Sequence, residues 1–164
     1  MHIKLDGGFC FAEAPWLSWK DIEYGLKNDF MTAKEVVEYT VRKLSSESSA
    51  EHYTLACLEG EDEFHVQESV SCLAGRELSG EVGSERVWVY LVFLWVFVNK
   101  DKFQDPLAVI EELYADFDYP DFIAPAVRYM PAEDSSLQGD DQLLVKLSNI
   151  LDVYGRELRS NRSG

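Results

Sequence analysis

Three aspartates alternate with aromatic residues in the stretch YADFDYPDF, residues 114–122. Carboxylates at this density can bind a divalent cation, share a proton as general acid and base, or attract a cationic partner. A calcium loop beginning at Asp116 is excluded, because it needs Gly at its sixth position and Glu at its twelfth, where this chain has Asp121 and Val127. Acid–base catalysis by Asp116 and Asp118 has no neighbouring His or Lys to assist it.

The same stretch also has a purely structural interpretation. Phe117 closes the apolar stripe of the preceding helix, and Pro120 favours an extended conformation at Tyr119. Asp118 is then placed to cap a second helix, with Asp121 in its first turn. This interpretation leaves Asp116 as the acid with no structural role.

Acidic residues are concentrated over longer segments as well. Residues 105–141 contain ten acids and one basic residue, Arg128, which is a local net charge of −9. Residues 59–68 add five acids and no Lys or Arg. Such patches are either solvated loops or surfaces that meet a basic partner. On the second interpretation, the predicted partner-binding residues are Asp116, Glu133, Asp134, Asp140 and Asp141.

No known catalytic or cofactor motif is present in the sequence. The chain has no Gly-rich phosphate loop, no HExxH and no Gly-x-Ser-x-Gly elbow. Four possible zinc ligands occur within 21 residues, but their spacing is looser than the close pairs of structural zinc sites; they are His52, Cys57, His65 and Cys72. Both cysteines of this set lie in apolar helical settings, where a free thiol packs as a small hydrophobe. We therefore predict no catalytic residue, no metal, no cofactor and no enzymatic activity.

The charge and composition of the whole chain limit its partners. Its 164 residues carry 15 Lys and Arg against 30 Asp and Glu, and the net charge of −15 opposes binding to nucleic acid or anionic membranes. The longest apolar run, residues 87–98, falls short of the ~20 residues that span a membrane. Three cysteines fit a reducing compartment, and the N-terminus has no secretory signal. We expect a cytoplasmic protein with a basic partner.

Helical patterns follow one another along the chain. Capping signals at Ser18, Thr32 and Asp105 each precede apolar residues at helical spacing. The run from Glu85 to Lys102 is apolar on every face, and its length without Gly or Pro favours a central buried helix over a strand.

Further helical patterns complete the predicted fold. They lie near residues 53–57, 66–78, 120–130 and 143–158. The expected fold is a single all-α domain of residues 1–164, a bundle of about seven or eight helices around the central one. Flexible ends are expected at about residues 1–14 and 159–164.

The most specific phrase of the sequence is PLAVIEELYADFDYPDFIAPAVRYMP, residues 106–131. A Leu-Ala-Cys-Leu helix and a Trp-x-x-Ile-x-x-Gly-Leu pattern that begins at Trp19 accompany it. With these phrases the chain resembles the bacterial DUF2247 family, over about residues 16–154. The resemblance implies a small α-helical domain without assigned catalytic residues. It also implies a link to relatives that have been proposed as immunity proteins of polymorphic or contact-dependent toxin systems.

Three hypotheses of function follow from these observations. The first is a non-catalytic acidic immunity protein that binds and neutralises a cognate bacterial toxin, such as a nuclease with a basic surface. The second is a metal-assisted hydrolase that uses the clustered aspartates. The third is a cytosolic scaffold or adaptor. The resemblance and the charge both favour the first.

Overall fold

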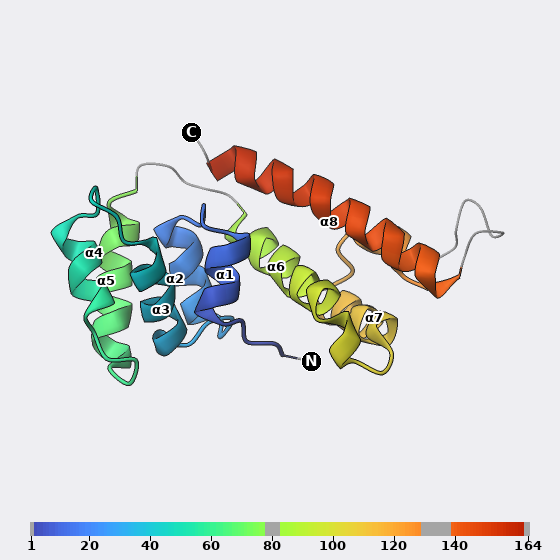
Figure 1. The fold of residues 1–164 in the computed structure, drawn as a ribbon, viewed down its shortest axis with the longest axis horizontal. Coiled ribbons are helices and arrows are strands. Elements are labelled where there is room, and N and C mark those ends of the chain that lie inside the picture. The colour runs from blue at the N-terminus through green and yellow to red at the C-terminus, as the bar shows by residue number, and fades with distance from the viewer. Residues whose placement is uncertain (1, 78–82, 129–138, 163–164) are drawn as a thin grey trace. The chain divides into compact units, whose positions relative to one another are not determined.

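The computed structural model describes residues 2–77, 83–128 and 139–162, and these ranges contain eight α-helices, two short 3-10 helices and no strand (Figure 1). The all-α prediction is therefore confirmed. The α-helices are α1 (Gly7–Glu13), α2 (Trp19–Lys27), α3 (Ala33–Lys43), α4 (Ala50–Ala56), α5 (Glu63–Gly75), α6 (Ser84–Val98), α7 (Pro106–Asp116) and α8 (Asp140–Arg162). The 3-10 helices are η1 (Lys100–Lys102) and η2 (Ala124–Ala126).

The chain divides into two compact units. The N-terminal unit comprises His2–Trp88 together with Arg162, and the C-terminal unit comprises Val89–Asn161. The boundary falls within α6, so the first turns of this helix belong to the N-terminal unit and the remainder to the C-terminal unit. The interpretation of residues 1–164 as one domain stays a prediction.

Helices α1 to α5 form the N-terminal unit. There α1 packs on α3, α2 packs on α5, and α4 contacts both α3 and α5 (Figure 1). The predicted caps at Ser18 and Thr32 are confirmed. The Ser18 hydroxyl accepts a hydrogen bond from the Asp21 amide at 3.1 Å, and the Thr32 hydroxyl accepts one from the Glu35 amide at 3.3 Å. These local bonds satisfy amides that an uncapped helix would leave unpaired.

Helix α1 was not predicted, because its seven residues are too few to show a helical period. Asp6 caps it by accepting from the Phe9 amide at 2.6 Å. Gly7 lets the helix approach α3 closely, because a Cβ atom at this position would lie 2.9 Å from the backbone nitrogen of Tyr39. Cys10 is fully buried on the same helix, and burial raises the pKa of its thiol far above the ordinary value.

Helix α6 confirms the prediction of a buried apolar helix from about Glu85. It begins at Ser84 and ends at Val98, and η1 continues the chain to Lys102. Seven consecutive residues, 87–93, are buried, which explains why the sequence shows no amphipathic period. Within the described ranges, no helix combines the length and the apolar character needed to cross a membrane.

Aromatic contacts organise the C-terminal unit. The rings of Phe122 and Tyr154 stack with centroids 4.0 Å apart, and the Phe93 ring meets Phe117 and Phe122 edge-on at 5.9 and 6.2 Å. These contacts connect α6, the turn after α7, and α8. The predicted cap of α7 is also confirmed, because Asp105 accepts from the Ala108 amide at 3.2 Å with Pro at the first helical position.

The helix predicted over residues 120–130 is wrong for the part that the structure describes. Residues 121–123 form a turn, and η2 is the only regular element between residues 120 and 128. The prediction relied on apolar residues at helical spacing, but Pro125 lacks the amide that a continued helix would need. Packing of Phe122 on Phe93 and Tyr154 holds this segment instead of a helical hydrogen-bond ladder.

We predict that Gly25→Ala destabilises the fold by about 2–3 kcal/mol, because a Cβ atom at Gly25 would overlap the Trp88 indole. That indole is fully buried and stacks on Phe30 with centroids 5.6 Å apart, so it has no room to retreat. Gly75→Ala is the matched control, because a Cβ atom there meets nothing within 4 Å. It should leave stability unchanged or raise it by up to about 1 kcal/mol. Urea denaturation measures both, and equal losses would contradict the packing argument.

Candidate functional site

The structure describes three of the five predicted partner-binding acids. Asp116 is the exposed last residue of α7, and Asp140 and Asp141 are exposed in the first turn of α8. Glu133 and Asp134 lie outside the described residues.

Arg128 contacts acids from the N-cap of α7, the middle of α7 and the start of α8. Its Nε atom donates to Glu111 at 2.7 Å and its Nη2 atom donates to Asp105 at 3.1 Å, while Nη1 lies 3.9 Å from a carboxylate oxygen of Asp140. The hydrogen bond to Glu111 holds the pKa of Arg128 above its ordinary value. Glu111 lies five residues before Asp116 on α7, so at about 1.5 Å per residue the two are separated by roughly 7.5 Å along the helix axis. The basic residue of the acidic segment is thus already paired with carboxylates.

The C-terminal end of α7 closes in a Schellman motif. The Tyr119 amide donates to the Tyr114 carbonyl at 2.8 Å, and the Asp118 amide donates to the Ala115 carbonyl at 3.1 Å. Asp118 and Tyr119 both have left-handed backbone, with φ of 59° and 58°. Glycine normally occupies the first of these positions, so two consecutive non-glycine residues here carry backbone strain.

Two predictions for this turn are therefore wrong. Asp118 ends α7 and does not cap a following helix, and Tyr119 is left-handed and not extended. The hydrogen bonds of the Schellman motif outweigh the extended preference that Pro120 imposes on the residue before it. The aromatic residues of this stretch pack inward, because Tyr114 is buried and the rings of Phe117 and Phe122 contact Phe93.

The acids of this turn oppose the electrostatics of the helix. Asp116 and Asp118 lie at the negative end of the α7 dipole, where the last turn has no basic residue. Tyr119 projects beside them with 55% of its surface exposed, and its ring meets Tyr114 edge-on at 5.3 Å. The turn thus presents an exposed aromatic ring next to two acids at the negative end of the helix dipole.

No group of three His, Cys, Asp or Glu side chains that could hold a metal ion exists among the residues that the structure describes. The cysteine interpretation was wrong in one respect: Cys57 and Cys72 are exposed and do not pack as small hydrophobes. His65 instead pairs with Asp62, its Nδ1 lying 2.7 Å from the carboxylate. The hydrolase and scaffold alternatives stay predictions.

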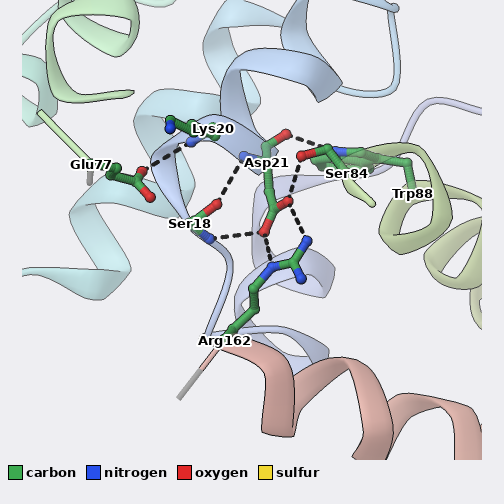
Figure 2. A network of polar contacts seen from close by, with 7 residues as sticks. All are labelled: Ser18, Lys20, Asp21, Glu77, Ser84, Trp88 and Arg162. Atoms are coloured by element: carbon green, nitrogen blue, oxygen red, sulfur yellow. Dashed lines mark hydrogen bonds and ion pairs between the residues drawn. The ribbon is translucent and has the colours of Figure 1, made fainter. Parts of the chain in front are cut away.

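An extensive polar network surrounds Asp21 (Figure 2). Its carboxylate is fully buried and accepts four hydrogen bonds within the N-terminal unit. The Ser18 amide donates at 3.1 Å, the Ser84 hydroxyl at 2.7 Å, and Nε and Nη2 of Arg162 each at 3.0 Å. The Trp88 indole N–H donates at 2.7 Å to the main-chain carbonyl of Asp21.

This network is structural in character. Burial would raise the pKa of Asp21, but the hydrogen bonds from Arg162, Ser84 and Ser18 lower it below its ordinary value. The Arg162 side chain is only 3% exposed, so the ion pair is closed to solvent. A carboxylate with every lone pair occupied is held ionised and has no site for a substrate proton.

Only the local part of this network is visible in the sequence. The capping signal at Ser18 involves Asp21, which is three residues away. Ser84 and Arg162 are 63 and 141 residues from Asp21, and no pattern in the sequence connects them. Arg162 was even placed in a flexible end.

The chain belongs to the family described as "Uncharacterized protein conserved in bacteria (DUF2247)", whose model matches residues 9–154. The resemblance drawn from residues 106–131 is confirmed at this level. No curated protein and no solved structure matches the chain.

We predict that Asp118→Gly raises the free energy of unfolding by about 1 kcal/mol, because glycine adopts the left-handed backbone without a Cβ clash. Asp118→Ala is the control, since it removes the same charge but keeps the Cβ atom. Urea denaturation should place the glycine variant above the alanine variant. Equal stabilities would mean that the charge, and not the backbone, is the source of the strain.

We predict that Asp21→Asn and Arg162→Met each cost about 3–5 kcal/mol at pH 7, because each leaves its buried partner uncompensated. The double variant should cost less than the sum of the two. The exposed pair of Arg156 and Asp152 is the control, and Asp152→Asn should cost no more than about 1 kcal/mol. If urea denaturation shows that the double variant loses as much free energy of unfolding as the two single variants together, the pairing argument is contradicted.

The contribution of Asp21 to the stability of the fold depends on pH and decreases in acid. Its pKa is lower in the folded state than the unfolded value of about 3.9, so the unfolded state binds the proton first as the pH falls. The stabilisation is fully present above about pH 4 and disappears as the pH falls through the folded-state pKa. The stability difference between the native chain and Asp21→Asn should therefore shrink in acid, and a constant difference would contradict it.

Proposed function

We propose that this chain is a non-catalytic immunity protein of the bacterial cytoplasm that binds and neutralises a cognate toxin with a basic surface. The single observation that carries the proposal is the acidic surface of the C-terminal unit. Between Lys102 and Lys146 the sequence has one basic residue, Arg128, and its guanidinium already pairs with Asp105 and Glu111. The acids of this segment outnumber the cation that could neutralise them locally.

Charge of this kind increases the rate of association more than it increases affinity. A net charge of −15 attracts a basic partner from a distance, and acids at the rim of an interface orient the partner before contact. Affinity needs apolar groups that become fully desolvated in the complex. Tyr119 fits this role, because it is exposed beside Asp116 and Asp118 and its ring is already held against Tyr114.

The strain in the turn after α7 supports the same proposal. Left-handed backbone at Asp118 and Tyr119, and acids at the negative end of a helix dipole, both lower stability. Backbone strain of this kind clusters at functional sites. The position of the strained turn among the predicted partner-binding acids is therefore consistent with an interface.

We predict that a basic protein co-purifies with the chain from its bacterial host, and that the association rate falls as salt rises because the steering charges are screened. Neutralising Asp116, Asp140 and Asp141 together to Asn should lower the association rate about tenfold at low salt, with little change in the dissociation rate. Tyr119→Ala should instead raise the dissociation rate. Stopped-flow or surface-plasmon measurements separate the two rates.

The control is an equal change of charge elsewhere. Glu59, Glu61 and Glu63 are exposed acids of the N-terminal unit, and changing all three to Gln alters the net charge by the same amount. If the association rate of this variant falls by a similar factor, the partner is attracted by the net charge of the chain and not by the proposed surface. Failure to capture any basic protein at low salt would overturn the proposed function.

A further inference from the structure

A pocket in the N-terminal unit contains several hydrogen-bond donors. It has a volume of 160 Å³ and lies where the start of α2, the end of α3 and the loop into α4 meet. Its lining residues are Trp19, Thr40, Lys43, Leu44, Ser45, Glu47, Ser48 and His52. None of them belongs to the proposed toxin-binding surface, so the pocket can be tested independently of the proposed function.

Lys43 supplies the positive charge of the pocket. Its Nζ atom donates to the Leu17 carbonyl at 3.2 Å and lies 5.9 and 5.6 Å from the ring centroids of Trp19 and Tyr39. These contacts are with neutral groups, so they orient the ammonium group without cancelling its charge. Burial lowers the pKa of Lys43, while the charges of Glu77 and Asp21 act in the opposite direction. An ammonium group that is partly desolvated interacts more strongly with an anion than one in water.

His52 supplies a neutral donor. The Ser49 amide donates to its Nδ1 atom at 2.9 Å, which makes Nδ1 the acceptor and assigns the ring proton to Nε2. Burial and the charge of Lys43 lower the pKa of His52, which favours this neutral form. The ring lies against the Trp19 indole, with centroids 5.4 Å apart.

Two serine hydroxyls complete the set of donors. The Ser48 hydroxyl oxygen accepts from the Ser45 amide at 2.9 Å, and the Ser45 hydroxyl oxygen accepts from the Glu47 amide at 3.2 Å. Each hydroxyl therefore keeps its proton for donation. The lining thus combines an ammonium group, an imidazole N–H and two hydroxyls with one carboxylate, that of Glu47.

We propose that this pocket binds a small organic carboxylate. A carboxylate accepts hydrogen bonds through both oxygens and donates none, so it matches a donor-rich lining that includes a cation. Trp19 and Leu44 provide an apolar wall for the body of the ligand. The volume of 160 Å³ suffices for one aromatic ring, since a cavity of about 150 Å³ binds benzene. The Glu47 carboxylate repels a dianion more strongly than a monoanion, so phosphate should bind more weakly than a carboxylate.

Benzoate is the probe, and its titration into the full-length protein can be followed by NMR. We expect saturable shifts of the Trp19 indole N–H, the His52 ring and the amides of residues 43–48. Benzyl alcohol, which keeps the ring without the charge, should bind at least tenfold more weakly. Inorganic phosphate should likewise bind at least tenfold more weakly. These comparisons need no variant and test the charge and the size of the ligand separately.

Variants then test the donors. Lys43→Met should weaken benzoate binding about tenfold to a hundredfold, which is the range expected for loss of a charge-assisted hydrogen bond. Lys34→Met is the matched control, because Lys34 is an exposed lysine on the same helix that does not line the pocket. Ser48→Ala changes only one atom, so it remains informative if Lys43→Met does not fold, and it should weaken binding at least threefold.

Several outcomes would overturn the proposal. These are shifts that map to exposed lysines outside the pocket, equal binding of benzoate and benzyl alcohol, or tighter binding of phosphate. Unchanged benzoate affinity in both Lys43→Met and Ser48→Ala would also overturn it.

Discussion

The N-terminal unit depends on the buried carboxylate of Asp21. A buried charge is tolerated only when its hydrogen-bonding capacity is filled, and here an amide, a hydroxyl and a bidentate guanidinium fill it. The residues that satisfy Asp21 come from positions 18, 84 and 162, so a single side chain fixes the positions of three distant parts of the chain. The adjoining indole of Trp88 bonds to the Asp21 carbonyl and fills the space that Gly25 leaves open. The hydrogen bonds of Asp21 and the packing of Trp88 therefore stabilise the same part of the N-terminal unit.

The acidic surface of the C-terminal unit is organised differently. Arg128 pairs with Asp105, which caps α7, and with Glu111 in the middle of this helix, whereas Asp116 and Asp118 lie at the negative end of the helix dipole, next to a strained turn. The Asp21 carboxylate accepts hydrogen bonds at every lone pair, whereas the turn after α7 has left-handed backbone at two consecutive non-glycine residues. The contrast is the reason that we assign a structural role to Asp21 and propose partner binding for the surface around Asp116. The family assignment to DUF2247 agrees with a bacterial protein and leaves that functional assignment as a proposal.

Local patterns predicted the fold well where the stabilising interactions are themselves local. The caps at Ser18, Thr32 and Asp105 involve partners three residues away, and each marks the start of a helix in the structure. The apolar run in α6 was recognised as a helix from its length and composition. The same reasoning failed over residues 120–128, where aromatic contacts with Phe93 and Tyr154 decide the backbone and the helical spacing of apolar residues is coincidental. It also missed α1, which is too short to carry a period.

The features of the candidate sites also fall into those that the sequence determines and those that only the tertiary structure decides. The sequence by itself determined the charge of the chain, the acidic segments, the helical class and the resemblance to DUF2247, because these depend on composition and on residues close together in the chain. Only the tertiary structure decided that Arg128 pairs with Asp105 and Glu111, that Asp21 meets Arg162, and that Trp19, Lys43 and His52 line one pocket. Such contacts join residues from different helices, and their formation depends on how those helices pack. Hydrophobic packing sets that arrangement through many weak contacts that act together, and no short stretch of sequence records their sum.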